Sequence, residues 1–380
     1  MIVTVVADVF GQANNGTTIA AMHLIDALQN AGHSVRVVCA DQDKKGKDGY
    51  YIVGTYWVGP FQSIVDKNGV SLAKPNITTL NEALSGSDEV HIMMPFAVGK
   101  AAAKMCQEKH IPVSAGFHVQ AENVTAHFFN LMSSSWVNRM VYRSFWKQFY
   151  RYVDVIHYPT QFIRDTFEKA IRQKTNGVVI SNGVSSRFHK KEVTRPKEWQ
   201  DKFVILCTGR FSKEKKQTLL IRAVAVSKYR DQIQIVFAGS GPRLAEMQKC
   251  AKKCHVSPEY RFFRRDELVD MINCADLYVH TSQIEIEAIS CLEALSCGVV
   301  PVINDSPKSA TRDFALHPEN LFRLNDVKDL SHKIDYWIEH PTEKAKVSEE
   351  YQHYCGQFDF DRCMQRMVTL IEDTAKIQRK

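Results

Sequence analysis

Long apolar runs, disulfide patterns and targeting signals are all missing from the sequence. No apolar stretch approaches the ~18 residues needed to span a bilayer, so we do not expect an integral membrane protein. The start, MIVTVVADVFGQ, lacks the basic segment and the small-residue cleavage site of a signal peptide and is expected to form a buried strand. The ten cysteines include no CxxC pair, so reduced core thiols and a cytosolic location are expected.

Patterns that bind metals are also scarce. Cys250, Cys254 and His255 lie close together, but no second ligand pair follows at the spacing of a zinc site. The lone sequence Asp359-Phe360-Asp361 stands where a helix is expected to begin, and aspartate is a good N-cap there. We therefore expect no metal and no other cofactor.

The composition is that of an ordinary globular protein. The 380 residues are 44% hydrophobic and 24% charged, and this length corresponds to two or three domains. The net charge of +7 favours an anionic partner without naming it. Nucleic acid, an acidic membrane and a diphosphate substrate remain alternatives on this ground alone.

Short apolar runs alternate with helical periods in both halves of the chain. Such strands predict parallel sheets that are covered by helices on both faces. Residues 17–31 have apolar positions at helical spacing, and Gly32 is expected to end that helix. The expected strands are Ile2–Val6, Val35–Cys39, Glu89–Met93, Val113–Gly116, Val155–His157, Val178–Ser181, Phe203–Cys207, Ile233–Ala238, Tyr260–Phe263, Leu277–His280 and Val299–Ile303.

A polar, charged segment at 185–201 interrupts this alternation. We predict two doubly wound α/β domains, residues 1–184 and 202–357, joined by a linker at 185–201. Ligands bind outside the carboxyl ends of the strands in such sheets, and two facing sheets would enclose a central cleft. The amphipathic last helix, within 358–380, is expected to pack back onto the first domain.

Three short segments of the second half carry chemistry. In Ser282–Ile303, Glu285 and Glu293 could accept hydrogen bonds from vicinal hydroxyls, although an exposed helix face would look similar. In Thr208–Lys216 (TGRFSKEKK), four cations stand near a helix N-terminus, where they are unfavourable unless an anion binds. A solvated lysine-rich loop is the alternative. Phe237–Arg243 (FAGSGPR) has two glycines that let a ligand approach the backbone, but the full dinucleotide fingerprint is missing.

Together with Ile180–Val184 (ISNGV) and a glycine-containing loop after the first strand, the ordered motifs resemble the family-4 retaining glycosyltransferases of the GT-B fold. Within that family the sequence is similar to the membrane-associated lipid glycosyltransferases. The resemblance implies two Rossmann-like domains facing a cleft, the first binding the acceptor and the second a nucleotide sugar. It also implies a transfer without a metal and without a protein nucleophile.

The resemblance assigns roles to single residues. Arg210 and Lys215 would bind the donor diphosphate, Glu285 the donor sugar and Glu293 the ribose. The sequence departs from the family pattern where the usual EGFG reads Glu-Ile-Glu-Ala, and in two further places that lack the usual glycines, FFRRDEL and the residues around Lys308–Ser309. The other residues expected near the donor are Gly16, Gly209, Gly241, Ile286, Glu287, Ala288 and Ile289.

The acceptor side is expected just past Val113–Gly116. The resemblance implies that His118 lies between the acceptor and the donor sugar and acts in catalysis. Gln120 and Asn123 continue a polar loop that would touch the acceptor. A core or loop-capping histidine is the alternative reading of His118.

A basic and aromatic segment, Trp136–Tyr152, follows. Arg139, Arg143, Lys147 and Arg151 recur at four-residue intervals, which places them along one stripe of a helix, and aromatic residues such as Trp146 fill the flanks. No acidic residue occurs from 123 to 153, which suits the surface of an anionic bilayer. The alternatives are a helix packed on the sheet with a solvated basic face, and a nucleic-acid surface, for which no fold signature is present.

These observations predict a peripheral enzyme on the inner face of the membrane. It would transfer a hexose from a nucleotide sugar, such as UDP-glucose or a related UDP-hexose, to diacylglycerol or a glycosyl-diacylglycerol. One alternative is a glycosyltransferase acting on a soluble or undecaprenyl-linked glycan. Another is a protein that binds a nucleotide sugar without catalysing transfer.

Overall fold

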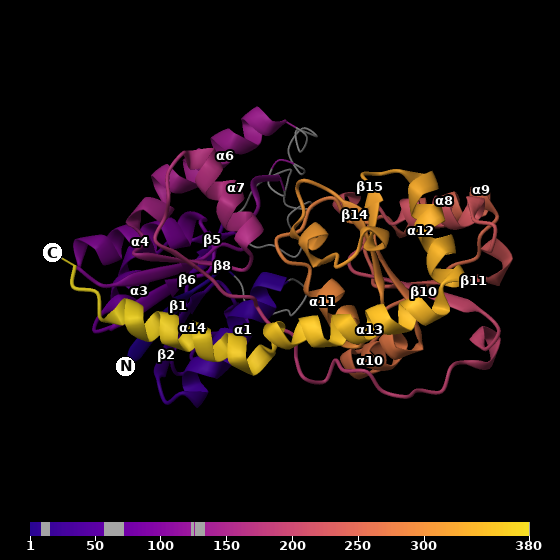
Figure 1. Ribbon diagram of the computed structural model, residues 1–380. Coiled ribbons are helices and arrows are strands. Elements are labelled where there is room, and N and C mark those ends of the chain that lie inside the picture. Colours follow the sequence, from indigo (N-terminus) through magenta and orange to yellow (C-terminus); the bar gives the residue numbers. More distant parts are fainter. Residues whose placement is uncertain (9–15, 57–71, 123–124, 126–133, 380) are drawn as a thin grey trace. The chain divides into compact units, whose positions relative to one another are not determined.

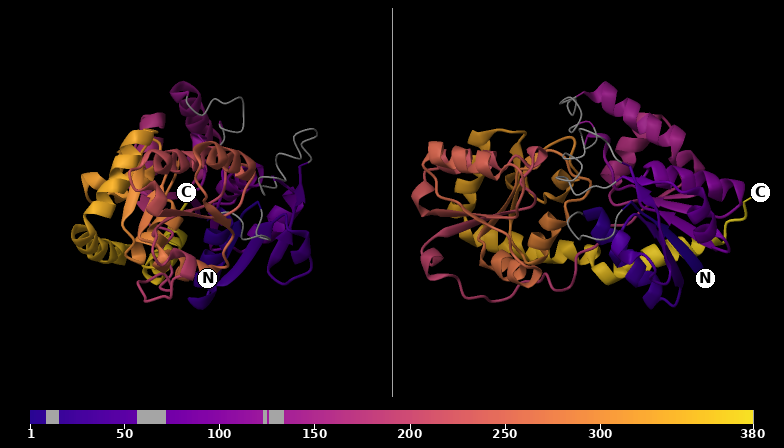
Figure 2. Two further views of the ribbon diagram at one scale, coloured as in Figure 1. Left: turned by 90° about the vertical axis from the view of Figure 1, so that its right-hand side faces the viewer. Right: turned by 180° about the vertical axis from the view of Figure 1, so that it is seen from behind.

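The computed structural model describes residues 1–8, 16–56, 72–122, 125 and 134–379. The chain divides into two compact units, Met1–Asn182 with Asp361–Lys380, and Gly183–Phe360 (Figure 1). Each unit is built on a parallel sheet with helices on both faces (Figure 2). The predicted fold class, two Rossmann-like α/β domains, is therefore confirmed.

The first unit has a seven-stranded sheet in the order β3-β2-β1-β6-β7-β8-β9, and every pair in it is parallel. The buried strand β1 lies between β2 and β6, so the strand order reverses beside it, which is where ligands bind in such sheets. The strands are β1 (Ile2–Val6), β2 (Ser34–Cys39), β3 (Tyr50–Ile52), β6 (Glu89–Ile92), β7 (Val113–Gly116), β8 (Val155–Tyr158) and β9 (Gly177–Val179). A separate antiparallel pair is formed by β4 (Gly54–Thr55) and β5 (Ala73–Lys74).

The helices of the first unit follow from apolar periodicity and local stop signals. Gly32, with φ +83°, takes the left-handed conformation just beyond the first helix, as the sequence predicts. Asn76 caps the next one by accepting a hydrogen bond from the Thr79 amide at 3.1 Å. The helices are α1 (Gly16–Asn30), α3 (Ile77–Leu84), α4 (Ala97–Glu108), α6 (Ser135–Gln148), α7 (Gln161–Ile171) and α14 (Phe360–Ala375).

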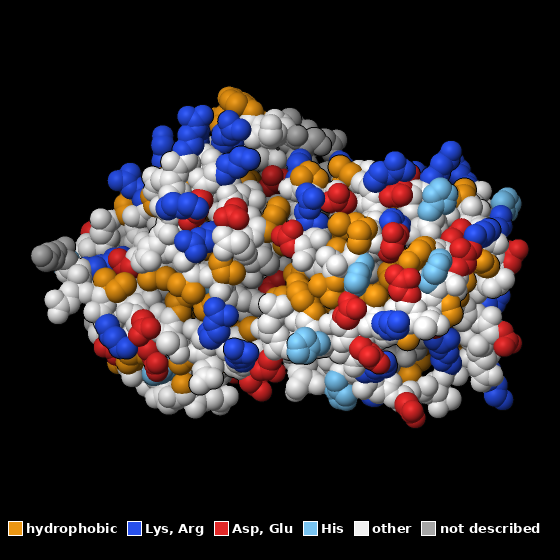
Figure 3. Space-filling model, viewed as in Figure 1, with side chains coloured by type: hydrophobic (Ala, Val, Ile, Leu, Met, Phe, Trp, Pro, Cys, Tyr) orange, Lys and Arg blue, Asp and Glu red, His pale blue; other side chains and the backbone are white. Residues whose placement is uncertain are grey.

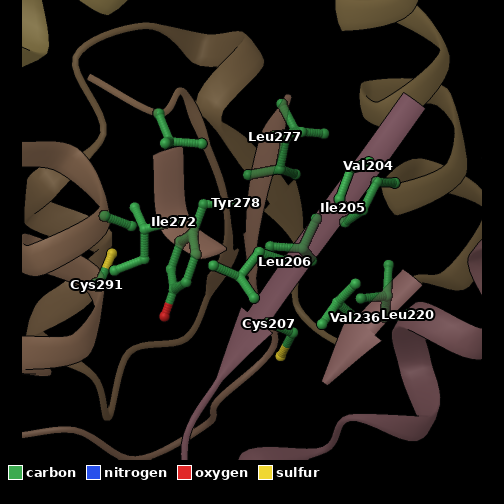
Figure 4. Packing of buried hydrophobic residues seen from close by; sticks show 14 of the residues in the cluster. Val204, Ile205, Leu206, Cys207, Leu220, Val236, Ile272, Leu277, Tyr278 and Cys291 are labelled. Atoms are coloured by element: carbon green, nitrogen blue, oxygen red, sulfur yellow. The ribbon is translucent and has the colours of Figure 1, made fainter. Parts of the chain in front are cut away.

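The second unit has a six-stranded parallel sheet in the order β12-β11-β10-β13-β14-β15. Its core includes Val204, Ile205 and Leu206 of the central strand and Tyr278 of the neighbouring one (Figure 4). The strands are β10 (Phe203–Thr208), β11 (Ile233–Ala238), β12 (Glu259–Arg261), β13 (Leu277–His280), β14 (Pro301–Asp305) and β15 (Leu321–Arg323). The helices are α8 (Thr218–Val226), α9 (Leu244–Cys254), α10 (Arg265–Cys274), α11 (Ile289–Ser296), α12 (Val327–Glu339) and α13 (Pro341–Cys355).

Residues 185–201, expected to form a linker, lie within the second unit. Phe188 and Trp199 are buried in its hydrophobic core. Arg195 pairs with Asp276 at 2.7 Å, which ties the segment to the residue before β13. Because the segment contains few apolar residues, its sequence does not indicate that these two aromatic side chains anchor it in the core.

Two observations concern membranes and metals. Among the described residues, no helix combines the length and the apolarity that crossing a bilayer requires. Within the same ranges, no group of three or more His, Cys, Asp or Glu side chains is arranged to hold a metal ion.

Candidate functional site

In the second unit, the loops that follow β10 and β13 meet at the carboxyl edge of the sheet. Gly209, with φ +129°, turns the chain after β10 toward a 3-10 turn at Lys213–Lys215. The turn is bound to the loop after β13: the Thr281 hydroxyl donates to the Lys215 carbonyl at 2.7 Å, and the Gln283 amide donates to the Glu214 carbonyl at 2.8 Å. These bonds fix the backbone from which the Lys215 side chain extends.

Lys215, Glu285 and His280 form a cluster at this edge, in which His280 is buried and the Lys215 and Glu285 side chains are 18% and 12% exposed. The Lys215 ammonium pairs with the Glu285 carboxylate, and the His280 Nε2 atom lies 3.2 Å from the same carboxylate oxygen. Burial alone would raise the pKa of Glu285, but the Lys215 charge and the His280 ring outweigh it and lower the pKa to about 2. Burial also opposes the charge on Lys215, yet Glu285 raises its pKa. Both partners are therefore ionised at neutral pH.

The loop that carries Glu285 is supported from the segment after β14. The Ser306 hydroxyl donates to the Gln283 carbonyl at 2.7 Å, and the Ala310 amide donates to the Glu285 carbonyl at 2.9 Å. Ala288 then adopts φ +58° just before α11, a left-handed conformation that costs a non-glycine residue about 1–2 kcal/mol. Such strain is characteristic of functional loops whose surroundings enforce it.

Glu293 lies on α11 and is almost fully buried. Its closest charged partner is Arg265, whose Nη2 atom lies 3.7 Å from the carboxylate. Burial raises the pKa of Glu293 to about 7, although Arg265 and Arg187 act in the opposite direction. A buried carboxyl whose nearest cation lies 3.7 Å away is suited to hydrogen-bond a ligand's hydroxyl groups.

The glycines near the donor candidates differ in what surrounds them. A side chain at Gly241, where φ is +154°, would come within 2.5 Å of the Phe211 carbonyl oxygen, so this glycine lets two backbone segments pack together. Gly16, the first residue of α1, has open space where a side chain would be. Of the other predicted donor residues, Glu287 is buried, whereas Ile286 and Ile289 are half-buried.

In the first unit, His118 lies just beyond β7. Its ring packs over Gly116, where a side chain would come within 2.4 Å of the Nε2 atom, and meets the His157 ring edge-on with centroids 5.6 Å apart. Burial, together with His157 and His91, holds the pKa of His118 well below its usual range. The ring is therefore neutral and can donate or accept a hydrogen bond.

A buried polar chain lies beneath this histidine. His91 contacts the Ser114 hydroxyl at 2.7 Å, and the Ser114 amide donates to the Glu89 carboxyl at 2.9 Å. Burial raises the pKa of Glu89 to about 8, so this carboxyl holds its proton at neutral pH. Because the group is neutral, it can remain in the core without an ion partner.

The polar loop after His118 is only partly described. Gln120 is fully buried. The neighbouring Glu122 accepts hydrogen bonds from the Tyr142 hydroxyl at 2.8 Å and from the Asn138 amide at 3.1 Å, so it anchors α6. Asn123 lies outside the described residues.

The basic and aromatic segment is divided by burial. Tyr142 and Phe145 of α6 are core residues, whereas Trp136 is 67% exposed and Met140 50% exposed. Trp146 is half-buried, and its ring lies 6.4 Å from that of Phe167. Figure 3 shows Lys and Arg side chains over α6, with hydrophobic surface at the upper end of this helix.

The predicted basic stripe is shorter than expected. Arg139 and Lys147 are exposed, and Arg143 is half-buried with its Nε atom donating to the Ala170 carbonyl at 3.2 Å. The helix ends at Gln148, and Arg151 falls in the 3-10 turn Tyr150–Tyr152, so the prediction that it continues the helical stripe is wrong. Phe149 and Tyr150, which follow the last residue of the helix, are buried, and the chain no longer follows the helix axis there.

Two residues of the site were not predicted. His280 is the last residue of β13, and its position at the carboxyl end of a strand is the one sequence signal that could have identified it. Arg265, which faces Glu293, stands at the start of α10 in the segment FFRRDEL. A single histidine or arginine has no spacing pattern of its own, so only the predicted strand end pointed to His280, and no pattern pointed to Arg265.

Two family models match successive parts of the chain. The one described as Glycosyltransferase Family 4 matches residues 14–188, and the one described as Glycosyl transferases group 1 matches residues 189–354.

Curated relatives extend this match. The chain is 25% identical over 236 residues to the alpha-monoglucosyldiacylglycerol synthase of Streptococcus pneumoniae, covering 58% of this chain and 52% of that protein. It is 25% identical over 394 residues to the GDP-mannose-dependent alpha-mannosyltransferase of Corynebacterium glutamicum, covering 93% and 88%. The chain thus spans about half the length of the first of these relatives.

Solved structures share the fold. HepE of Anabaena, in complex with UDP and glucose, has a TM-score of 0.74 at 16% identity and covers 98% of this chain and 100% of that one. The catalytic domain of the cholesterol-alpha-glucosyltransferase from Helicobacter pylori is 45% identical, with a TM-score of 0.40, over 40% of this chain and 96% of that one.

The two matched segments adjoin at residues 188 and 189 and include most of both α/β units. The order of the motifs, the two parallel sheets and the structural neighbour agree with this match. The chain belongs to the family-4 glycosyltransferases of the GT-B fold.

Proposed function

We propose that the chain transfers a hexose from a UDP-hexose, such as UDP-glucose, to the hydroxyl of a membrane lipid such as diacylglycerol or a glycosyl-diacylglycerol. The observation that carries this proposal is the cluster of Lys215, Glu285 and His280 at the carboxyl edge of the second sheet. Two similarities support the choice of substrates: one relative is an alpha-monoglucosyldiacylglycerol synthase, and HepE binds UDP and glucose.

In the proposed reaction, the bond between the anomeric carbon and the diphosphate oxygen breaks, and the acceptor oxygen forms a new bond to that carbon. Lys215 and Arg210 stabilise the negative charge on the leaving diphosphate, because a preorganised cation acts more strongly in a buried site than in water. The leaving phosphate takes the acceptor's proton on the same face, which retains the configuration. No metal ion and no protein nucleophile takes part.

The other residues bind and orient. Glu285 holds the Lys215 ammonium in place and accepts hydrogen bonds from the donor sugar, and Glu293 accepts hydrogen bonds from the ribose. The neutral ring of His118 binds and orients the acceptor. The exposed side of α6, with Trp136, Met140 and Arg139, binds the anionic inner face of the membrane and brings the enzyme to its acceptor.

The test measures nucleoside diphosphate release from UDP-, GDP- and ADP-hexoses, with and without anionic vesicles that contain a lipid alcohol. Release from a UDP-hexose that depends on the lipid, with a new glycolipid in the extract, supports the proposal. Release that is indifferent to lipid but dependent on a glycan would move the acceptor to the alternative class. Absence of release with every donor and acceptor would contradict an enzymatic role.

The donor-site residues are tested by Lys215→Ala and Glu293→Ala. Each should lower kcat/KM by about 100-fold or more, since removal of one preorganised charge or hydrogen-bond partner commonly costs this much. Lys249→Ala, on the exposed side of α9, is the matched control and should retain full activity. Full activity in a folded Lys215→Ala variant would contradict the assignment of the diphosphate site.

A further inference from the structure

The four cations of the segment Thr208–Lys216 do not all face the same way. Lys215 pairs with Glu285, whereas Lys213 and Lys216 line a separate pocket of about 450 Å³ in the second unit. This pocket lies among the N-terminal parts of α8, α9 and α12. Its lining residues include none of the predicted donor residues and are Ser212, Lys213, Lys216, Gln217, Thr218, Leu219, Arg222, Arg243, Glu246, Met247, Asn325 and Val327.

The lining of the pocket has an excess of positive charge. Four of the lining side chains are basic, those of Lys213, Lys216, Arg222 and Arg243, and one is acidic, Glu246, which pairs with Arg243. Burial, followed by the charges of Lys213 and Arg243, lowers the pKa of Lys216 from its usual range. Like charges gathered in a partly enclosed space repel one another, and a bound anion would reverse this repulsion.

The backbone around the pocket points to the same kind of ligand. No side chain caps α8 or α9, and the first-turn amides of Leu219, Leu220 and Leu244 donate to backbone carbonyls, so these helix ends offer an anion their dipoles and not a set of free amides. The N-terminal ends of these helices attract negative charge, which cations at the same place would otherwise oppose. Lys216 also adopts φ +53°, an unfavourable conformation for a lysine that nonetheless brings it to the pocket.

We propose that this pocket binds a phosphate-bearing anion and that the bound anion stabilises the turn Lys213–Lys215. Several basic side chains around a space of this size match the multiple oxygens of a phosphate group. The turn is shared, since Lys213 lines the pocket on one side and Lys215 reaches Glu285 on the other. An anion in the pocket should therefore strengthen binding of the donor. This consequence rests on the proposed function, whereas the binding of the anion does not depend on it.

The experiment titrates inorganic phosphate into the full chain saturated with UDP, at constant ionic strength, and follows heat of binding and Tm. UDP occupies the donor cations, so the remaining signal reports the pocket. We expect a saturable rise in Tm. The double variant Lys213→Gln, Arg222→Gln should weaken phosphate binding at least ten-fold, since two charge-assisted contacts are lost.

The matched control is Lys249→Gln, Lys253→Gln, which removes the same charge from an exposed part of α9 outside the pocket. It should bind phosphate within two-fold of the unchanged chain. No saturable signal, or an equal loss in both double variants, would overturn the proposal. If UDP does not bind, the proposed function is contradicted. Phosphate binding to the pocket can then still be measured by the same titration in the Lys215→Ala variant.

Two further arms complete the test. Vesicles of phosphatidylcholine with phosphatidic acid distinguish a lipid headgroup from free phosphate. If the unchanged chain and the control variant pellet with these vesicles and the pocket variant does not, the ligand is the headgroup. If the chain responds only to soluble phosphate, the ligand is the free ion. Binding is reciprocal, so phosphate should raise UDP affinity by the factor by which UDP raises phosphate affinity. Phosphate binding without any change in UDP affinity would refute the coupling through the turn.

Discussion

At Ala288 the backbone is held in a left-handed conformation, φ +58°, immediately before the helix that carries Glu293. We expect Ala288→Gly to change the free energy of unfolding by less than about 0.5 kcal/mol, because relief of about 1 kcal/mol of strain offsets a similar gain in unfolded-state entropy. Ala294→Gly, in the buried interior of the same helix, should cost about 2 kcal/mol. Denaturant titration of both variants measures the contrast, and equal losses would show that the loop is unstrained.

The raised pKa of Glu293, about 7, predicts a pH dependence of stability. Between its ordinary value of 4.5 and this raised value the folded state keeps the proton that the unfolded state has lost. The contribution of Glu293 to the free energy of unfolding is therefore fully present below about pH 4.5. It falls as the pH rises toward 7, by at most about 3 kcal/mol. Glu293→Gln should remove this part of the slope.

Amide hydrogen exchange of β10 at pH 5 and pH 8, corrected for intrinsic rates, measures the slope in the second unit. Glu198→Gln, an exposed glutamate of the same unit, is the control and should leave the slope unchanged. Glu285 should add almost no slope between pH 5 and pH 8, since its ordinary pKa of 4.5 and its lowered pKa of about 2 both lie below this range. An unchanged slope in Glu293→Gln would contradict the assigned burial of its charge.

The sequence anticipated some of these residues better than others. Lys215 and Glu285 each belong to a recognisable motif, and both follow strands of one parallel sheet, so their meeting at its carboxyl edge is a consequence of topology. The pairing of His280 with the same carboxylate depends on which strands are neighbours. A linear pattern contains no such information for an isolated histidine.

At the scale of elements, α6 shows which features of a helix the periodicity of its sequence predicts and which it does not. The four-residue spacing correctly predicts a helix, but it does not tell which of two aromatic faces enters the core. Tyr142 and Phe145 pack inward, and the exposed face keeps Trp136 and Met140 beside basic residues. The three-residue edge strands β3 and β15 were missed, whereas β9 and β12, which are equally short edge strands, were predicted, so length alone does not decide whether such a strand can be detected.

The exposed face of α6 yields a prediction about membranes. Arg139→Gln with Lys147→Gln should weaken binding to anionic vesicles by about 2 kcal/mol, roughly 30-fold, because each cation near such a surface contributes about 1 kcal/mol. The control pair, Lys104→Gln with Lys109→Gln, removes equal charge from exposed positions on and after α4. Vesicle co-sedimentation at two salt concentrations measures both. Equal weakening by the two pairs would indicate attraction by net charge alone.

At the scale of the whole molecule, alternating strands and helices sufficed to predict two parallel α/β units, because buried parallel strands are long enough to show continuous apolar runs. The unit to which the chain's last segment belongs is decided by contacts between residues that are far apart in the sequence. Asp361–Lys380 groups with the first unit, although it follows the second in the chain. Arg379 pairs with Asp154 at 2.7 Å, and Glu372 contacts His33 at 3.1 Å.

This arrangement predicts that damage to α14 is felt in the first unit. Ile371 is fully buried, so Ile371→Ala should destabilise by about 2–5 kcal/mol through lost burial and the remaining cavity. Exchange of the β1 amides should accelerate at least 30-fold, while exchange of the β10 amides stays unchanged. Thr369→Ala, exposed on the same helix, is the control and should alter neither. Faster exchange in β10 alone would assign α14 to the second unit, and equal acceleration in both strands would mean that the two units unfold as one.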